Sequence, residues 1–292
     1  MQRSGRAFPR IGLLLSTLFA CILGGCATPV SRVPAERSNW EEDQNFSRRH
    51  WKRFSPPQEV DKVQRLALFG TYYYTPSHRY VPDGVTILDL DGRSLGPKLA
   101  SKDFCNAADE GAFRAPSSLG ASRYASYTYA GAPALSHAQV SCAGFFQTKL
   151  NQFSRGEVAE NWPNIVAGFE RSRFRRSIAP YGNGGSTRWL VPWRTIATFN
   201  SQIPPGSVLY IPQVRGAKVA LPSGHVVVHD GYFFAADSGG GIKTDHIDFF
   251  TGLIAPKPFL LPGIDGRSNR FDAYVVINDR VAAHFKGLHR ME

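Results

Sequence analysis

The C-terminal half of the chain consists of short stretches rich in β-branched and aromatic residues, separated by turns that contain Gly and Pro. Five of these stretches are predicted strands: Thr195–Phe199, Val208–Ile211, Val226–His229, Gly231–Ala236 and Ala273–Ile277. Closely spaced short strands with few helices are typical of a β-barrel or a β-sandwich. We therefore expect a mainly β protein.

The N-terminal half shows fewer regular patterns. Leu66–Tyr74 is predicted to be a strand that ends at a proline, and Val85–Leu88 is a second candidate. Ser101–Asp103 indicates the start of a helix. Residues 130–190 have weak periodicity and turn signals such as Gly182–Gly185, so we expect a loop-rich stretch there.

The first twenty-six residues read as a secretion signal. Three arginines without an acidic residue precede an apolar run from Ile11 to Leu23, which is too short to span a bilayer. The four residues that end at Cys26 resemble the bacterial lipobox, which implies cleavage after residue 25 and a lipid on Cys26. An ordinary cleaved signal next to an unrelated cysteine is the alternative. Because Ala27 follows the cysteine, the resemblance implies the periplasmic face of the outer membrane in a Gram-negative host.

Charge and cysteine usage narrow the choice of partners. The chain has 34 basic and 23 acidic residues, and loss of the signal removes three arginines, which leaves a net charge of +8. A basic surface favours anionic partners such as envelope polymers, and without a nucleic-acid motif we expect no nucleic acid. Of the remaining cysteines, Cys105 and Cys142 either pair in an oxidising compartment or stay as two separate thiols.

Acidic residues gather after the predicted strand that ends at Ala236. Asp237, three glycines from Gly239, Lys243, Asp245 and Asp248 lie within twelve residues of one another. A carboxyl group near like charges or apolar surface has a raised pKa and can protonate a glycosidic oxygen. A polar turn in which the aspartates cap backbone amides is the alternative. A calcium loop is disfavoured because the EF-hand spacing is absent.

Three blocks of the sequence resemble a known family. Asp237–Lys243 with Asp248 resembles the signature D-x-G-G-A-I-K-x-x-x-x-D of the 3D (three-aspartate) domain and of the related membrane-bound lytic transglycosylase A family. Arg194–Ile211 resembles that family's strand and its I-P-x-G-x-x-V/L-Y/W turn. Gly70–Pro76 resembles its aromatic G-Y-Y-x-P strand. The chain therefore looks like a member of this family.

The resemblance implies a fold and a reaction. The fold is a six-stranded double-psi β-barrel formed by residues 64–80 and 190–280, with an inserted second lobe at 81–189. A signal at 1–25 and a tether at 26–63 precede it. The reaction is the non-hydrolytic cleavage of peptidoglycan glycan strands between MurNAc and GlcNAc, which gives a 1,6-anhydro end. Asp248 is the single acid and base, and Asp237 supports it with a fixed negative charge.

We assign substrate binding to Lys243, Gly239, Gly240, Tyr72 and Tyr74, because glycines allow close approach and aromatic rings stack on sugars. No metal or other cofactor is expected, since nearby histidines lack the spacing of a zinc site. Two features depart from the family pattern: Phe199 replaces its first Asp and Gly241 replaces an Ala. A non-catalytic wall-binding lipoprotein is the alternative function, and a structural partner for another envelope protein is a third.

Overall fold

A computed structural model describes residues 51–150, 162–185, 187–199, 201–239, 242, 245–253, 261, 264 and 266–291. All of them belong to one compact unit that spans residues 36–292. The predicted signal, Cys26 and most of the predicted tether lie outside the described residues. Within the ranges given above, no helix has the length and apolar character needed to cross a membrane.

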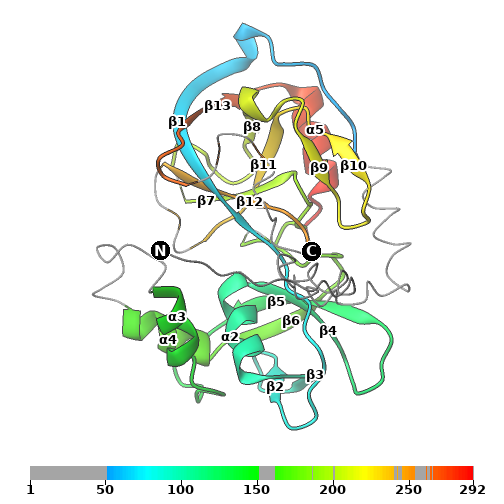
Figure 1. Ribbon diagram of the computed structural model, residues 1–292, viewed down its shortest axis with the longest axis vertical. Coiled ribbons are helices and arrows are strands. Elements are labelled where there is room, and N and C mark those ends of the chain that lie inside the picture. Colours follow the sequence, from blue (N-terminus) through cyan, green and yellow to red (C-terminus); the bar gives the residue numbers. More distant parts are fainter. Residues whose placement is uncertain are drawn as a thin grey trace, which may run out of the picture. The chain divides into compact units, whose positions relative to one another are not determined.

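Six strands form one closed sheet in the order β1-β12-β7-β11-β8-β13 (Figure 1). Their bounds are Lys62–Tyr73 (β1), Thr195–Thr198 (β7), Val208–Tyr210 (β8), Tyr232–Asp237 (β11), His246–Phe250 (β12) and Phe271–Val276 (β13). β1 closes the sheet because it is long enough to pair with β13 along its first half and with β12 along its second half. The expectation of a mainly β protein with a six-stranded sheet is confirmed.

Alternating side chains divide the barrel into an interior and an outer face. Leu68, Ile196, Phe233 and Phe249 belong to one buried cluster and are at most 1% exposed. Because successive side chains of a strand point to opposite faces, the residues between them face outward. The outer face of β12 therefore carries His246, Asp248 and Phe250.

One α-helix, two short 3-10 helices and a β-hairpin accompany the barrel strands. Part of the outer face packs against α5 (Asp279–Leu288), where the Asn278 side chain accepts a hydrogen bond from the Val281 amide at 3.2 Å. The other elements are η1 (Glu59–Asp61), η2 (Pro212–Val214), β9 (Lys218–Ala220) and β10 (Val226–Val228). β9 and β10 pair as an antiparallel hairpin.

Residues between β1 and β7 form a second set of elements with a core of its own. The strands are β2 (Val85–Leu88), β3 (Ser94–Leu99), β4 (Ala112–Pro116), β5 (Tyr124–Gly131) and β6 (Arg173–Ser177). The helices are α2 (Ser101–Glu110), α3 (Ala143–Leu150) and α4 (Trp162–Glu170). Two helices and one strand thus lie within the loop-rich stretch 130–190, where the sequence indicated no regular element.

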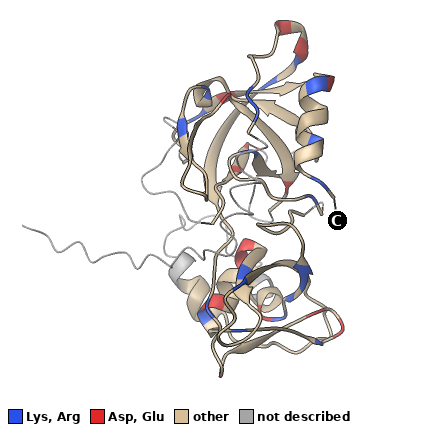
Figure 2. Ribbon diagram, turned by 90° about the vertical axis from the view of Figure 1, so that its right-hand side faces the viewer, with Lys and Arg blue, Asp and Glu red and all other residues tan. Residues whose placement is uncertain are grey.

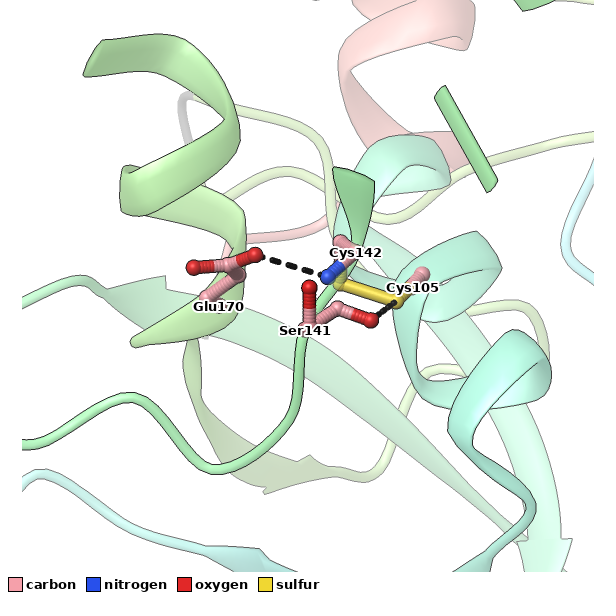
Figure 3. The surroundings of a disulfide bond; sticks show 4 residues. All are labelled: Cys105, Ser141, Cys142 and Glu170. Atoms are coloured by element: carbon pink, nitrogen blue, oxygen red, sulfur yellow. Dashed lines mark hydrogen bonds between the residues drawn. A yellow bond between two sulfur atoms is a disulfide. The ribbon is translucent and has the colours of Figure 1, made fainter. Parts of the chain in front are cut away.

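A disulfide joins two parts of this second core (Figure 3). Cys105 of α2 and Cys142 are bonded, with their Cα atoms 5.6 Å apart, and both are buried. The Glu170 carboxylate accepts a hydrogen bond from the Cys142 amide at 2.7 Å. In the structure these cysteines are thus a pair and not two separate thiols. Closing a loop of 37 residues contributes about 4 kcal/mol to stability in the chain-entropy account.

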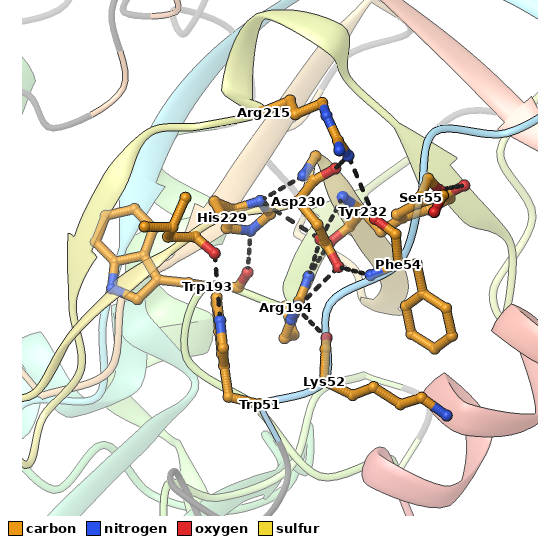
Figure 4. Close-up of polar contacts among 12 residues, drawn as sticks. Trp51, Lys52, Phe54, Ser55, Trp193, Arg194, Arg215, His229, Asp230 and Tyr232 are labelled. Atoms are coloured by element: carbon orange, nitrogen blue, oxygen red, sulfur yellow. Dashed lines mark hydrogen bonds and ion pairs between the residues drawn. The ribbon is translucent and has the colours of Figure 1, made fainter.

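The segment Trp51–Ser55 lies on the barrel, although the sequence assigns it to the tether. The Phe54 amide donates to the Asp230 carboxylate at 2.8 Å, and the Tyr232 hydroxyl donates to the Ser55 carbonyl at 3.0 Å (Figure 4). The Arg194 guanidinium lies 4.0 Å from the Trp51 ring centre. An ordered strap therefore replaces the expected tether from Trp51 onward.

Candidate active site

Four neighbouring strands bring four side chains into one row across the outer face of the barrel. Thr71 on β1 pairs with Asp248 on β12, and Asp248 pairs with Ala197 on β7. Ala197 also pairs with Asp237 at the end of β11, where the register shifts after Ala235, so that Asp237 does not follow Phe233 and Ala235 into the interior. Residues opposite each other in a sheet share a face, so both aspartates flank the small side chain of Ala197. Two strand spacings place their Cα atoms roughly 10 Å apart.

Asp248 occupies a protected position in this row. Its side chain is only 22% exposed. Burial raises the pKa of its carboxyl to about 6, although a hydrogen bond from the Thr71 hydroxyl acts in the opposite direction. The acid is therefore largely protonated in mildly acidic solution, which is the state that a general acid requires.

A short hydrogen-bond chain leads from His246 to Asp248. The His246 Nε2 lies 2.7 Å from the Thr71 hydroxyl, which in turn donates to the Asp248 carboxyl. Burial, and then the charge of Arg267, lower the pKa of His246, which favours the neutral ring. With Nε2 protonated, every member of the chain has a donor and an acceptor in the correct order.

Asp237 is held by backbone amides. Its Oδ1 accepts hydrogen bonds from the amides of Gly185 and Ser238, each at 2.7 Å. Burial raises its pKa, and the Asp248 charge acts in the same direction, whereas these amides and the Tyr73 hydroxyl oppose the shift. The Tyr73 hydroxyl is buried and close enough to lower the pKa of Asp237, but it forms no hydrogen bond of ordinary geometry with the described residues. The net shift makes Asp237 a weaker acid than an exposed aspartate.

A glycine loop contacts Asp237 from the other side. A Cβ on Gly184 would lie 2.4 Å from the Ala236 carbonyl oxygen and 2.9 Å from the Asp237 side chain. A Cβ on Gly185 would lie 2.3 Å from the Ser238 hydroxyl. The sequence marks Gly182–Gly185 only as a turn, so its contact with the carboxylate is new.

The two tyrosines expected to bind sugar, Tyr72 and Tyr74, differ in their positions relative to the aspartates. Tyr72 packs toward the barrel interior, with its ring 5.8 Å from Phe249, whereas its neighbour Tyr73 shares the outer face with the aspartates. Strand alternation thus puts Tyr72 on the face opposite the aspartates, where it would not contact a substrate held beside them. Tyr74 is half-buried just beyond β1.

The glycine-rich turn after β11 is described only in part. The Gly239 carbonyl accepts a hydrogen bond from the Ile242 amide at 3.0 Å. Gly240 and Lys243 lie outside the described residues, so their assignment to substrate binding stays a prediction.

Other residues near the row have structural partners. Asp245 forms an ion pair with Arg270, and this hydrogen bond is the main cause of its lowered pKa. Among the residues that the structure describes, no group of three or more His, Cys, Asp or Glu side chains is arranged to hold a metal ion.

Comparison with known proteins connects this site to a family. Residues 194–255 match the family model of the 3D domain. This stretch is a 3D domain. It contains β7, β8, β11 and β12, and thus both aspartates and Ala197. The predicted resemblance to the 3D domain is confirmed. No curated protein sequence matches the chain.

Several solved structures match most of this chain at low sequence identity. E. coli MltA with bound chitohexaose has a TM-score of 0.45 and 19% identity, over 73% of this chain and 72% of that chain. A membrane-bound lytic murein transglycosylase from Agrobacterium tumefaciens has a TM-score of 0.45 and 17% identity, over 85% and 86%. LtgG, a lytic transglycosylase of Burkholderia pseudomallei, has a TM-score of 0.34 and 17% identity, over 72% and 71%.

Proposed function

We propose that this chain is a peptidoglycan lytic transglycosylase that cleaves the MurNAc–GlcNAc bond, with Asp248 as its single acid and base. The observation that carries the proposal is the protected carboxyl of Asp248, whose pKa burial raises to about 6. The 3D domain around it supports the proposal, because Asp248 stands at the second aspartate of the signature that links this domain to lytic transglycosylases.

The reaction needs one proton donor that becomes a proton acceptor. Asp248 gives its proton to the glycosidic oxygen as the C1–O bond breaks, and positive charge develops at C1. The C6 hydroxyl of MurNAc then attacks C1, and its proton passes to the Asp248 carboxylate. The products are a 1,6-anhydro end and a free GlcNAc hydroxyl, and no water is consumed.

Asp237 has a supporting role in this proposal. Its carboxyl lies on the opposite side of Ala197, and the two charges oppose each other's ionisation. The pair therefore retains a proton in conditions under which two separate aspartates would both be ionised. When Asp248 gives this proton to the glycosidic oxygen, the negative charge left on the two carboxyls stabilises the positive charge at C1.

The same proposal includes the finer features of fold and location. The mixture of parallel and antiparallel pairs in the six-stranded sheet supports a double-psi barrel. The lipobox-like residues before Cys26 support a lipid anchor at the periplasmic face of the outer membrane. Peptidoglycan is the polymer that an enzyme held there would meet.

The test is digestion of purified sacculi with mass detection of the new ends. The wild-type protein is expected to release anhydro-muropeptides, and Asp248→Asn to lower the rate by about 100-fold or more, because the substituted amide cannot donate an acidic proton. Asp83→Asn, at an exposed turn, is the matched control and keeps full activity. Reducing ends in the products would indicate a hydrolase, and sacculus binding without products would indicate the wall-binding module.

A further inference from the structure

A buried asparagine lies at the start of the glycine loop that contacts Asp237. Asn183 is only 4% exposed, and two residues later the Gly185 amide donates to the Asp237 carboxylate at 2.7 Å. A surface turn does not need a buried amide side chain, because burial of an amide without hydrogen bonds costs free energy. The partners of Asn183 therefore indicate what it does.

The Asn183 side chain connects the loop to two strands of the β4-β5-β6 sheet. Its Oδ1 accepts hydrogen bonds from the Ser177 hydroxyl of β6 at 2.6 Å and from the Thr128 hydroxyl of β5 at 3.3 Å. Its Nδ2 donates to the Thr187 carbonyl at 3.0 Å. Because a carbonyl can only accept, the nitrogen has to face Thr187 and the oxygen has to face the two hydroxyls. Neither a carboxylate nor an aliphatic side chain could make both kinds of hydrogen bond.

The backbone of the loop is held at the same point. The Asn183 amide donates to the Thr128 hydroxyl at 2.9 Å, and the Thr187 amide donates to the Gly184 carbonyl at 2.9 Å. Gly182 allows this approach, since its φ is +85° and a Cβ there would lie 3.0 Å from the Thr128 hydroxyl. The amide that binds the aspartate is thus held from both ends of the turn.

We propose that Asn183 is a positioning residue for the aspartate pair, which holds the Gly185 amide against Asp237 and so makes β5 and β6 part of the catalytic centre. This inference rests on the proposed function and deepens it, because it adds to that reaction a residue that acts through a backbone amide. It also gives the sheet of the second core a role in the chemistry of the barrel.

The expected consequence concerns the ionisation of Asp237. Burial raises its pKa, and the charge of Asp248 acts in the same direction. The amides of Gly185 and Ser238 and the hydroxyl of Tyr73 favour the ionised form. Displacement of the Gly185 amide removes one of these stabilising groups, so the pKa of Asp237 should rise further.

The test is a ¹³C NMR titration of protein with labelled aspartate carboxyls, in which the Asp237 signal is the one missing from Asp237→Asn. We expect Asn183→Ala to raise the pKa of Asp237 by about one unit, a roughly tenfold lower acid dissociation constant. With sacculi as substrate, the low-pH limb of the pH–rate profile should move to higher pH as well. Thr128→Val, which removes the hydroxyl at similar volume, should act in the same direction, whereas Thr128→Ser should keep the wild-type pKa.

Asn278→Ala is the matched control, because the Asn278 side chain also accepts from a backbone amide, that of Val281 at the start of α5. It is expected to leave the pKa of Asp237 unchanged. If Asn183→Ala does not fold, Thr128→Val gives the result. An unchanged pKa in the folded variants, or an equal rise in Asn278→Ala, would overturn the inference. Because the titration needs no substrate, wild-type protein that releases no anhydro-muropeptides would refute the proposed function separately.

Discussion

The carboxyl of Asp248 links the chemistry of the site to the stability of the fold. Its pKa is raised from 3.8 to about 6 by burial, so the folded protein holds this proton more tightly than the unfolded chain. Stability from this group is therefore fully present below about pH 4 and is lost as the pH rises toward and through about 6. Above that range the ionised, buried carboxyl destabilises the fold.

Asp248→Asn should therefore stabilise the protein while it abolishes activity. Two pKa units correspond to about 3 kcal/mol at most, so we expect the free energy of unfolding at pH 8 to rise by up to that amount and to change little at pH 4. Urea unfolding at the two pH values measures this, with Asp83→Asn as the surface control. A variant that is equally or less stable at pH 8 would show that Asp248 is not held against its ionisation.

Thr71→Val tests the hydrogen bond that opposes the effect of burial. Removal of the hydroxyl takes away a donor to the ionised form, so the pKa of Asp248 should rise by about one unit. The upper limb of the pH–rate profile then moves to higher pH. The control is Thr198→Val on β7, since the Thr198 hydroxyl is buried without a partner among the described residues. An unchanged profile for Thr71→Val would contradict the hydrogen bond's role.

At this scale the sequence predicts the acids but not their neighbours. Asp237 and Asp248 are identifiable because their spacing matches a signature. Thr71 and His246 carry no such pattern: they reach Asp248 through the register of β1 and β12, which joins residues about 175 positions apart. Tyr73 is missed for a related reason, because three consecutive tyrosines give no indication of which one faces outward until the interior is known.

At the scale of elements, the site depends on β7 and on the glycine loop that contacts β11. Ala197 keeps the space between the aspartates open, and the Gly185 amide fixes one of them. Gly184 is needed for close approach, since an added Cβ would overlap the Ala236 carbonyl. The loop and the strand therefore form one unit, although about fifty residues separate them in the sequence.

Gly184→Ala should displace the loop and with it the Gly185 amide. We expect activity on sacculi to fall about tenfold or more and the fold to lose on the order of 1–3 kcal/mol, as overpacked sites do. Gly287→Ala is the control: an added Cβ there meets open space on α5, and alanine in a helix stabilises it by up to about 1 kcal/mol. Full activity in Gly184→Ala would show that the loop does not position Asp237.

Element type was predicted better for strands than for helices. The strands near residues 195, 208, 232 and 273 follow clear apolar stretches, and the structure has strands there. α3 and α4 have eight and nine residues, which is too few turns for a helical period to stand out from surrounding glycines and polar residues. Their helical form depends on packing against the second core, which local sequence does not reveal.

On the scale of the whole molecule, the positive net charge is spread widely. Figure 2 shows Lys and Arg, as well as Asp and Glu, on several elements of the chain. Attraction to anionic wall polymers would thus be a property of the entire surface. Selection among glycans therefore requires local groups in addition to total charge.

A buried ion pair connects the strap to the barrel and to the strand that carries Ala197. Arg194, directly before β7, lies 2.5 Å from the Asp230 carboxylate, and both side chains are at most 1% exposed. Arg194 also donates to the Lys52 carbonyl at 2.9 Å, while Asp230 accepts from the Phe54 amide. Burial alone would raise the pKa of Asp230, but Arg194 holds it below its usual range. One pair thus fixes both the N-terminal strap and the start of β7.

Asp230→Ala should destabilise the protein far more than an exposed substitution. It leaves the Arg194 charge buried without its partner and removes the acceptor of the Phe54 amide, so we expect a loss of about 3–5 kcal/mol in the free energy of unfolding. Asp272→Ala is the control, because its pair with Arg65 is exposed and contributes about 1 kcal/mol or less. The double variant Arg194→Met with Asp230→Leu removes both charges and should recover most of the loss. Urea unfolding of the wild type, the two single aspartate variants and the double variant measures these differences. If the double variant is as unstable as Asp230→Ala, the hydrogen bonds of the pair, and not only removal of the unpaired charge, are needed to hold the strap.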